Sequence, residues 1–376
     1  MLALPVLTSL AGFAPSIFIY VLCWLFMAST GLLFLEISQW VKHDSNIISM
    51  ADSTLGHAGK YSAWCLYLFL FYCLTIAYIV GCGNIVQQIL PFNLPDWMGP
   101  LLFVLIFAPL ILIPTATAGH LNIILVGGLA ISFVAFVILG IPHVNTKLLN
   151  YSDWSKSATV LPIAFTSFAY QGIIPTLNSY MHHDVTRTRQ AIIIGSSIPL
   201  LAYVIWQWLI MGIIPTEGPG GLMEALKQGD NAVHPLKNFI PGSAVYVIGQ
   251  FFAFFALITS FLGVALGLRD FLADGLRIEK TMQGKIILAL MILVLPLVIA
   301  VLYPHIFLSA LDYAGGFGCA LLLGLLPILM VWSGRYRLGL KKEPQLLGGR
   351  LILILLACFV LFEVASELTR QFSKIG

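Results

Sequence analysis

Charged side chains are scarce in this sequence. They make up 9% of its 376 residues, about a third of the share that is typical of soluble domains. Hydrophobic residues account for 59%, and a soluble chain cannot hide that much apolar surface from water. The formal net charge of +3 is small and is spread over several segments, so it gives no reason to expect a nucleic acid as a partner. The composition predicts an all-α polytopic membrane protein that lies in a lipid bilayer.

The sequence also has few residues arranged for metal or covalent chemistry. Its six cysteines lie inside apolar segments without the spacing of metal ligands, so we interpret them as small buried side chains rather than disulfides or a zinc site. No histidine-glutamate zinc pattern and no nucleophile-base pair falls convincingly within an apolar segment. We therefore expect no metal, no cofactor and no enzyme activity. An intramembrane enzyme is the alternative, and product formation from a labelled substrate would reveal it.

Long hydrophobic runs, in contrast, recur along the whole chain. Runs of roughly 20 apolar residues are long enough to cross the hydrocarbon core of a bilayer as helices. They predict membrane spans over residues 13–40, 61–90, 98–116, 121–142, 158–181, 189–214, 244–269, 284–303, 306–332 and 350–370. The opening residues, MLALP, have the character of the end of one further apolar helix.

The distribution of basic residues predicts the orientation. When the connecting segments are assigned alternately to the two sides, thirteen of the 19 lysines and arginines fall on one side and six on the other. The side with the excess is cytoplasmic by the positive-inside rule, so the C-terminus is expected on the opposite, outer side of the membrane. A chain of eleven spans would then begin in the cytoplasm, whereas Met1 falls within the membrane. We therefore expect that the first half of span 1 is absent from this sequence.

The stretch FTSFAYQGIIPTLNSYM, residues 165–181, has Gly172 and Pro175 in the middle of a span. Glycine loosens a helix, and proline removes one of its hydrogen bonds. Backbone groups freed in this way are tolerated in a membrane only where they face protein or a wet cavity. We expect an unwound segment near Tyr170, Gln171 and Gly172, with a simple proline kink as the alternative. A second glycine-rich stretch, YAGGFG at residues 313–318, indicates either a flexible gate or tight packing.

The opening MLALP has a proline in the matching place. If it is the second half of span 1, and residues 158–181 are span 6, Pro5 corresponds to Pro175. Interrupted helices at matching places in two five-span halves are typical of inverted-repeat transporters, which bind substrate near the membrane midplane. A half-helix that starts near Ile173 would offer free N–H groups and the positive end of its dipole to a carboxylate.

Other polar residues within the spans are candidates for a binding site. Tyr72 and Thr75 lie on one helical face and could contact a substrate side chain; a packing face is the alternative. Thr259 and Ser260 carry hydroxyls that could help to bind a cation or could bond back to their own helix. Buried ionisable residues are functional candidates in membranes. Among these, which include Asp312 and Glu363, we expect Glu36 to relay a proton, and most of the residues to be solvated or paired.

Several of these stretches resemble the bacterial tyrosine- and tryptophan-specific permeases, the aromatic branch of the amino acid–polyamine–organocation transporters. The resemblance is carried by FTSFAYQGIIPTLNSYM, IIIGSSIPLLAYVIWQ, SFLGVALGLRDFLADGL and YPHIFLSALDYAGGFG, and by MLALP, which is similar to the tail of that family's span 1 motif. It implies eleven spans in an inverted-repeat fold, residence in the bacterial inner membrane and proton-coupled uptake of aromatic amino acids. The family also has a glycine-rich unwinding before the residues that match Met1 to Pro5. This sequence does not contain it. Because Met1 matches an internal residue of that motif, a start codon assigned too far downstream is the simplest account, and a non-functional remnant is the alternative.

These arguments predict a single transporter domain over residues 1–376. It comprises a truncated first repeat over 1–142, a second inverted repeat over 158–332 and an extra helix over 350–370, with helices 1 and 6 broken. The expected function is proton symport of tyrosine or tryptophan; a sodium-coupled or neutral amino acid carrier is the alternative. The expected substrate contacts are Phe168, Tyr170, Gln171, Gly172, Ile173, Tyr72, Thr75 and Ser260. In this interpretation, the backbone of residues 170–173 holds the substrate carboxylate and Phe168 closes the pocket.

Overall fold

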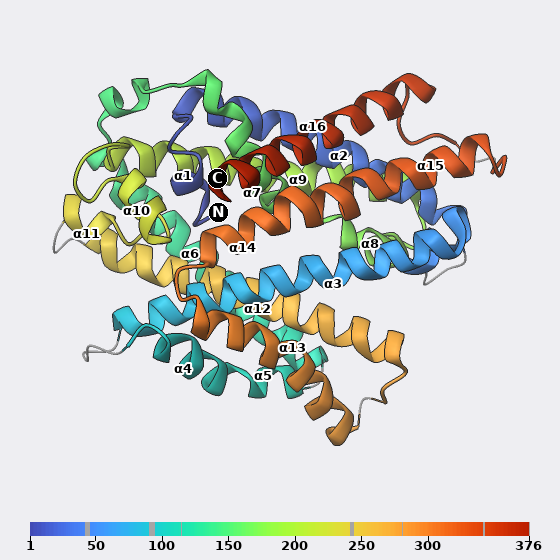
Figure 1. The fold of residues 1–376 in the computed structure, drawn as a ribbon, viewed down its shortest axis with the longest axis horizontal. Coiled ribbons are helices and arrows are strands. Elements are labelled where there is room, and N and C mark those ends of the chain that lie inside the picture. The colour runs from blue at the N-terminus through green and yellow to red at the C-terminus, as the bar shows by residue number, and fades with distance from the viewer. Residues whose placement is uncertain are drawn as a thin grey trace. The chain divides into compact units, whose positions relative to one another are not determined.

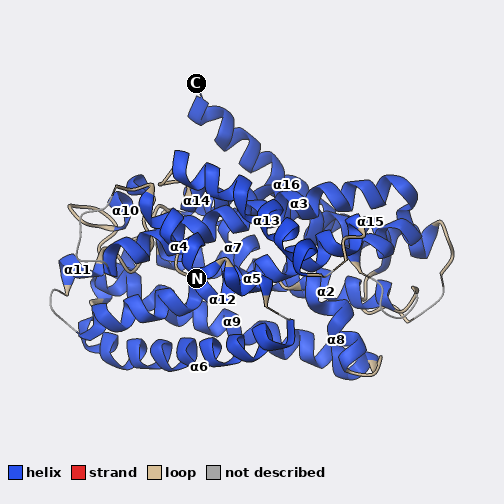
Figure 2. Ribbon diagram, turned by 90° about the horizontal axis from the view of Figure 1, so that it is seen from below, coloured by secondary structure: helices blue, strands red, loops and turns tan. Residues whose placement is uncertain are grey.

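The computed structural model describes residues 1–41, 46–89, 95–113, 115–240, 244–279, 281–340 and 343–375. Within these ranges the chain forms helices and loops, without a strand (Figure 2). Nine helical segments of the described chain are long and apolar enough to cross a membrane, and a shorter apolar segment covers Met98–Leu112. These segments match the predicted spans in order, which confirms the prediction of an all-α polytopic membrane protein. Residues 90 and 114, inside two predicted spans, lie outside the described residues.

The helices are labelled in Figure 1. Their bounds, in chain order, are α1 (Leu4–Leu7), α2 (Phe13–Ser38), α3 (Ile47–Ile89), α4 (Met98–Phe107), α5 (Pro109–Leu112), α6 (Thr115–Gly140), η1 (Ile141–His143), η2 (Thr146–Asn150), η3 (Trp154–Val160), α7 (Leu161–Ser167), η4 (Gln171–Ile173), α8 (Ile174–Tyr180), α9 (Val185–Ile213), α10 (Leu222–Gln228), α11 (Leu236–Phe239), α12 (Ala244–Leu276), α13 (Met282–Leu302), α14 (Phe307–Tyr313), η5 (Ala314–Leu325), α15 (Leu326–Tyr336) and α16 (Gly349–Ile375). The η elements are 3₁₀-helices, except η5, which is a π-helix.

The chain divides into two compact units, each built from segments distant in sequence. Unit 1 comprises Met1–Phe13, Phe71–Tyr151 and Trp206–Leu311, and unit 2 comprises Ala14–Leu70, Ser152–Ile205 and Asp312–Gly376. In unit 1, α6 packs along α12, and α13 packs on α4 and α5. In unit 2, α7 and α16 both pack on η5. The predicted repeats over 1–142 and 158–332 follow other boundaries and stay a prediction.

Helix α3 begins at Ile47, earlier than the predicted start at residue 61. Its first turns are amphipathic, since Ile47, Met50, Ala51 and Thr54 are buried at helical spacing. Gly56 has a φ of +71° and interrupts the helical geometry there, a conformation that is unfavourable for residues with a Cβ. The polar residues around this interruption lowered the apolar signal, and the prediction therefore missed the segment that precedes it.

The glycine-rich stretch at residues 313–318 serves close packing in unit 2. A Cβ at Gly315 would collide with the backbone oxygen of Pro162 in α7, and one at Gly316 would meet the side chain of Glu367 in α16. The chain does not break there but continues as the π-helix η5. Of the two interpretations of this stretch, the contacts support tight packing.

Candidate functional site

The helix over residues 154–180 is interrupted in its middle. Helix α7 ends at Ser167, residues 168–170 are not helical, and a 3₁₀ turn, η4, leads into α8 at Ile174. Pro175 lies in the first turn of α8, where its missing N–H costs no helical hydrogen bond. The interruption predicted from Gly172 and Pro175 is therefore present. It separates two half-helices and is more than a proline kink.

Two side chains of the interruption hold it to α2 within unit 2. The Gln171 side chain is fully buried, and its Nε2 donates to the Met27 carbonyl at 3.2 Å and to Thr30 Oγ1 at 3.1 Å. The Tyr170 hydroxyl donates to the same Met27 carbonyl at 3.4 Å. The Gln171 Oε1 also accepts the Tyr170 backbone N–H at 2.9 Å. These bonds fix the unwound backbone, so the two side chains act here as anchors.

The backbone N–H groups at the start of η4 are available to a ligand. The Ile173 N–H donates to the Tyr170 carbonyl at 3.0 Å. The N–H groups of Gln171 and Gly172, in contrast, have no hydrogen-bond acceptor among the described residues. Gly172 is exposed, and a Cβ placed on it would contact nothing within 4 Å. Unpaired N–H groups at the start of a helical segment attract anions. The predicted position for a carboxylate therefore has free donors and open space next to it.

Phe168 and Ile173 lie on either side of this stretch and differ in exposure. Phe168 is buried and packs edge-on against Tyr203, with ring centroids 5.3 Å apart, and Tyr203 donates to the Ser167 carbonyl at 2.9 Å. Ile173 is 59% exposed. Phe168 is thus seated in the packing of unit 2, while Ile173 and Gly172 present the accessible part of the segment.

The other predicted contacts belong to unit 1. Tyr72 donates its hydroxyl to the Met291 carbonyl of α13 at 2.8 Å, and buried Thr75 bonds back to the Phe71 carbonyl at 2.7 Å. Thr259 also bonds back to its own helix, at 2.8 Å to Phe255. The half-buried Ser260 hydroxyl has no hydrogen-bond partner among the described residues. Ser260 is therefore the member of this group whose hydroxyl is free to accept a ligand.

Glu36, the predicted proton relay, is fully buried in an ion pair. Both its oxygens accept from Arg335, at 2.6 Å from Nε and 2.6 Å from Nη2, and Gln345 N donates to Oε2 at 2.9 Å. A bidentate pair of this kind stabilises the ionised carboxylate. The contacts join α2, α15 and the segment before α16 within unit 2. A role of Glu36 in proton transfer stays a prediction.

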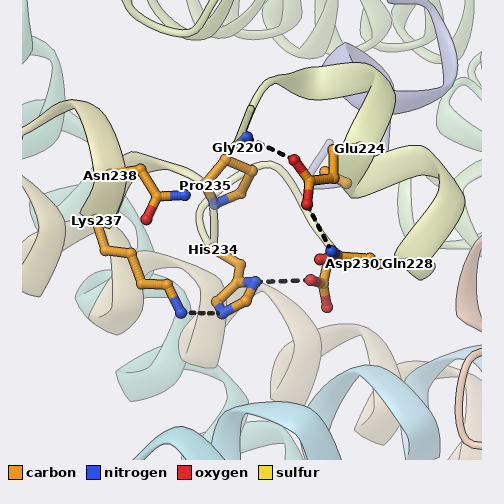
Figure 3. A pocket seen from close by; sticks show the side chains of 9 residues that line it. Gly220, Glu224, Gln228, Asp230, His234, Pro235, Lys237 and Asn238 are labelled. Carbon is orange, nitrogen blue, oxygen red and sulfur yellow. Dashed lines mark hydrogen bonds and ion pairs between the residues drawn. The ribbon is translucent and has the colours of Figure 1, made fainter. Parts of the chain in front are cut away.

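A polar pocket of unit 1, which the sequence did not predict, lies between α10 and α11 (Figure 3). It has a volume of about 220 Å³. His234 bridges Asp230 and Lys237, with 2.7 Å from Nδ1 to Asp230 Oδ2 and 2.7 Å from Nε2 to Lys237 Nζ. Glu224 accepts from the Gly220 N–H at 2.6 Å. The ionisable side chains that line this pocket are paired with neighbouring groups, whereas small-molecule sites are lined mostly by apolar side chains with a few polar groups.

Comparison with known proteins supplies the family. The family model for tryptophan/tyrosine permeases matches residues 1–366. The chain is 32% identical over 361 residues to the tyrosine-specific transport system 1 of Haemophilus influenzae, a match that covers 94% of this chain and 89% of that protein. It is 29% identical over 385 residues to the tryptophan-specific transport protein of Pseudomonas aeruginosa, covering 100% of this chain and 91% of that protein.

A solved structure supplies the fold. The crystal structure of MhsT in complex with L-phenylalanine matches with a TM-score of 0.65 over 99% of this chain and 94% of that chain, at 14% identity. The fold is thus that of a transporter, and the resemblance drawn from the sequence motifs is confirmed. This chain is a multi-pass membrane protein, and it belongs to the tryptophan/tyrosine permease family.

Proposed function

We propose that this protein imports an aromatic amino acid, tyrosine or tryptophan, across the bacterial inner membrane by proton symport. Relatives named as tyrosine-specific and tryptophan-specific transport proteins support this substrate class, as does the L-phenylalanine in the matching MhsT structure. Transport would proceed by alternating access, in which the substrate and the proton shift the protein between conformations. The C-terminus would lie in the periplasm, as the distribution of basic residues predicts.

The observation that carries the proposal is the interrupted helix. Its unpaired N–H groups at Gln171 and Gly172 can bind the carboxylate that every free amino acid carries, with the start of the helical segment adding a partial positive charge. The anchors of Tyr170 and Gln171 on α2 hold these donors in place. A pre-positioned backbone binds with less loss of conformational freedom than a mobile loop would.

The substrate side chain would be recognised by the remaining predicted residues. Ser260 offers a free hydroxyl, and Tyr72 an aromatic ring that can stack against a phenol or an indole. Thr75 and the Tyr72 hydroxyl would have to exchange their present bonds to Phe71 and Met291 to reach a ligand. Phe168 would have to leave its present packing against Tyr203 to close the pocket over the substrate.

A pair of glycine substitutions tests the carboxylate position. A Cβ at Gly172 and one at Gly195 in α9 both meet nothing within 4 Å, and both glycines are exposed. Gly172→Leu should abolish saturable uptake of labelled tyrosine and tryptophan, because its side chain would cover the free N–H groups. Gly195→Leu should insert equally well and transport normally. Equal uptake by the two variants, at equal amounts in the membrane, would contradict the proposal.

The coupling ion is tested separately in proteoliposomes. An inward proton gradient without sodium should drive accumulation of the labelled amino acid above its external concentration. A sodium gradient at equal pH on both sides should not. The opposite result would assign the chain to the sodium-coupled carriers and reject proton symport.

A further inference from the structure

The carboxylate of Glu363 in α16 is buried without a hydrogen-bond donor. Its side chain is 0% exposed, and neither Oε1 nor Oε2 has a partner among the described residues. An ionised carboxylate is strongly disfavoured where neither water nor a donor reaches it. In this conformation the side chain is therefore stable as the neutral acid, with a bound proton. Its place within a membrane-spanning helix makes it a functional candidate by default.

The charged groups near Glu363 leave it without a counter-ion. Arg370 donates through Nη2 to Asp312 at 2.9 Å and to Glu367 at 2.6 Å, so its guanidinium is shared by two other carboxylates. The groups that act electrostatically on Glu363 are Glu367 and Arg370 on its own helix, Asp312 of α14, and the Cys23 thiol of α2. Of these, only Arg370 is positive, and it already holds two acidic groups. A third negative charge, on Glu363, would be opposed by the carboxylates of Asp312 and Glu367.

The surroundings of Glu363 differ in the two directions along α16. One helical turn before it, the Phe359 ring packs on Phe26 and Phe165, with centroids 5.1 Å and 5.8 Å away. One turn after it, Glu367 and Arg370 continue toward the end of α16, and the Arg370 side chain is 22% exposed. An apolar layer therefore lies on one side of the acid and a chain of polar groups on the other.

The cluster is also in contact with the interrupted helix, all within unit 2. Asp312 lies two residues before η5, and Gly316 of η5 packs on the Glu367 side chain. One residue earlier, Gly315 packs on the Pro162 carbonyl of α7, the half-helix that precedes the interruption. π-Helical turns are rare and concentrate at functional sites. The cluster and the half-helix α7 are therefore both in contact with η5.

We propose that Glu363 is the side chain that binds the co-transported proton, with Asp312, Glu367 and Arg370 forming its polar access from the end of α16. The inference rests on the proposed proton symport. One proton adds to a carboxylate oxygen of Glu363 and later leaves it, and no other bond changes. Release requires a conformation in which Arg370 or water reaches the carboxylate, because the described conformation offers the ionised form no donor. Coupling follows if that conformation opens toward the cytoplasm.

Two assays on the purified protein in proteoliposomes test this inference. The first is accumulation of labelled substrate driven by an inward proton gradient. The second is exchange of labelled for unlabelled substrate without a gradient, which needs binding and reorientation but no net proton movement. Glu363→Gln mimics the protonated acid permanently, so it should keep exchange within about twofold of the unsubstituted protein and lose gradient-driven accumulation. Glu279→Gln, at an exposed glutamate, is the matched control and should keep both.

The outcomes are distinct. Failure of the unsubstituted protein to accumulate substrate would contradict the proposed function, and this inference with it. Accumulation by Glu363→Gln at the unsubstituted level, or loss of exchange as well by a variant that inserts normally, would overturn the inference alone. If Glu363→Gln is not recovered from the membrane, Glu363→Asp decides: it keeps an acid at a changed position, and should accumulate with an altered pH dependence. An unaltered pH dependence would overturn the inference.

Discussion

At the scale of single residues, two buried glutamates of the same unit have opposite surroundings. Glu36 accepts two bonds of 2.6 Å from Arg335, while Glu363 has no donor in the part of the chain that the structure describes. The sequence identified both as ionisable residues within spans, but it favoured Glu36 for the proton. The two glutamates differ in their partners, and the partner of Glu36, Arg335, lies 299 residues away along the chain. A single sequence does not contain such pairings, so it could not separate a neutralised ion pair from an unpaired acid.

The Glu36–Arg335 pair leads to a prediction about stability. The Arg335→Met variant leaves a fully buried carboxylate without its counter-ion, and removing one partner of a buried pair costs about 3–5 kcal/mol. We expect a markedly lower midpoint of thermal unfolding in detergent for this variant. The double variant Glu36→Leu with Arg335→Met should recover most of the loss, since it removes both charges. Equal destabilisation of the single and double variants would show that packing, rather than charge, sets the cost.

At the scale of elements, the interrupted helix was predictable and the π-helix was not. Gly172 and Pro175 mark the interruption because each weakens the helix through its own backbone chemistry, whatever surrounds it. The bonds that hold the unwound residues come from Met27 and Thr30 of α2. Those residues carry no distinctive signal, because a methionine and a threonine within an apolar run are ordinary. In the same way, the sequence YAGGFG shows a run of small residues, but the atoms that pack against them depend on the neighbouring helices.

The packing of η5 on α7 gives a prediction at this scale. A Cβ at Gly315 would collide with the backbone oxygen of Pro162. A backbone atom cannot relieve the collision by changing rotamer, as a side chain could. Overpacking of this kind costs roughly 1–3 kcal/mol, so Gly315→Ala should lower the thermal unfolding midpoint and reduce substrate exchange. Gly263→Ala in α12 is the control, because a Cβ there meets nothing within 4 Å. If both variants unfold at the same temperature, the close approach of η5 to α7 has no energetic role.

At the scale of the whole molecule, composition and charge distribution determine most of what could be foreseen. The run lengths predicted the spans, since a bilayer requires roughly 20 apolar residues in each helix. The ends of the spans were less accurate, because a short amphipathic helix, such as the turns of α3 before Gly56, can precede the apolar part of a span. The division into two units of interleaved segments depends on tertiary contacts, and it is not visible in hydropathy.

The orientation of the chain is a prediction at the same scale. Arg335, Arg337 and Arg350 flank the connection between α15 and α16, and an excess of basic residues marks cytoplasmic segments. Alkaline phosphatase, which is active only in the periplasm, should therefore be active when fused after the last residue and inactive when fused after Leu340, before α16. The same orientation puts the partly exposed Arg370 on the periplasmic side, from which an imported proton would enter toward Glu363. The reverse pattern of activity would invert the topology and make the polar end of α16 an exit for the proton rather than its entrance.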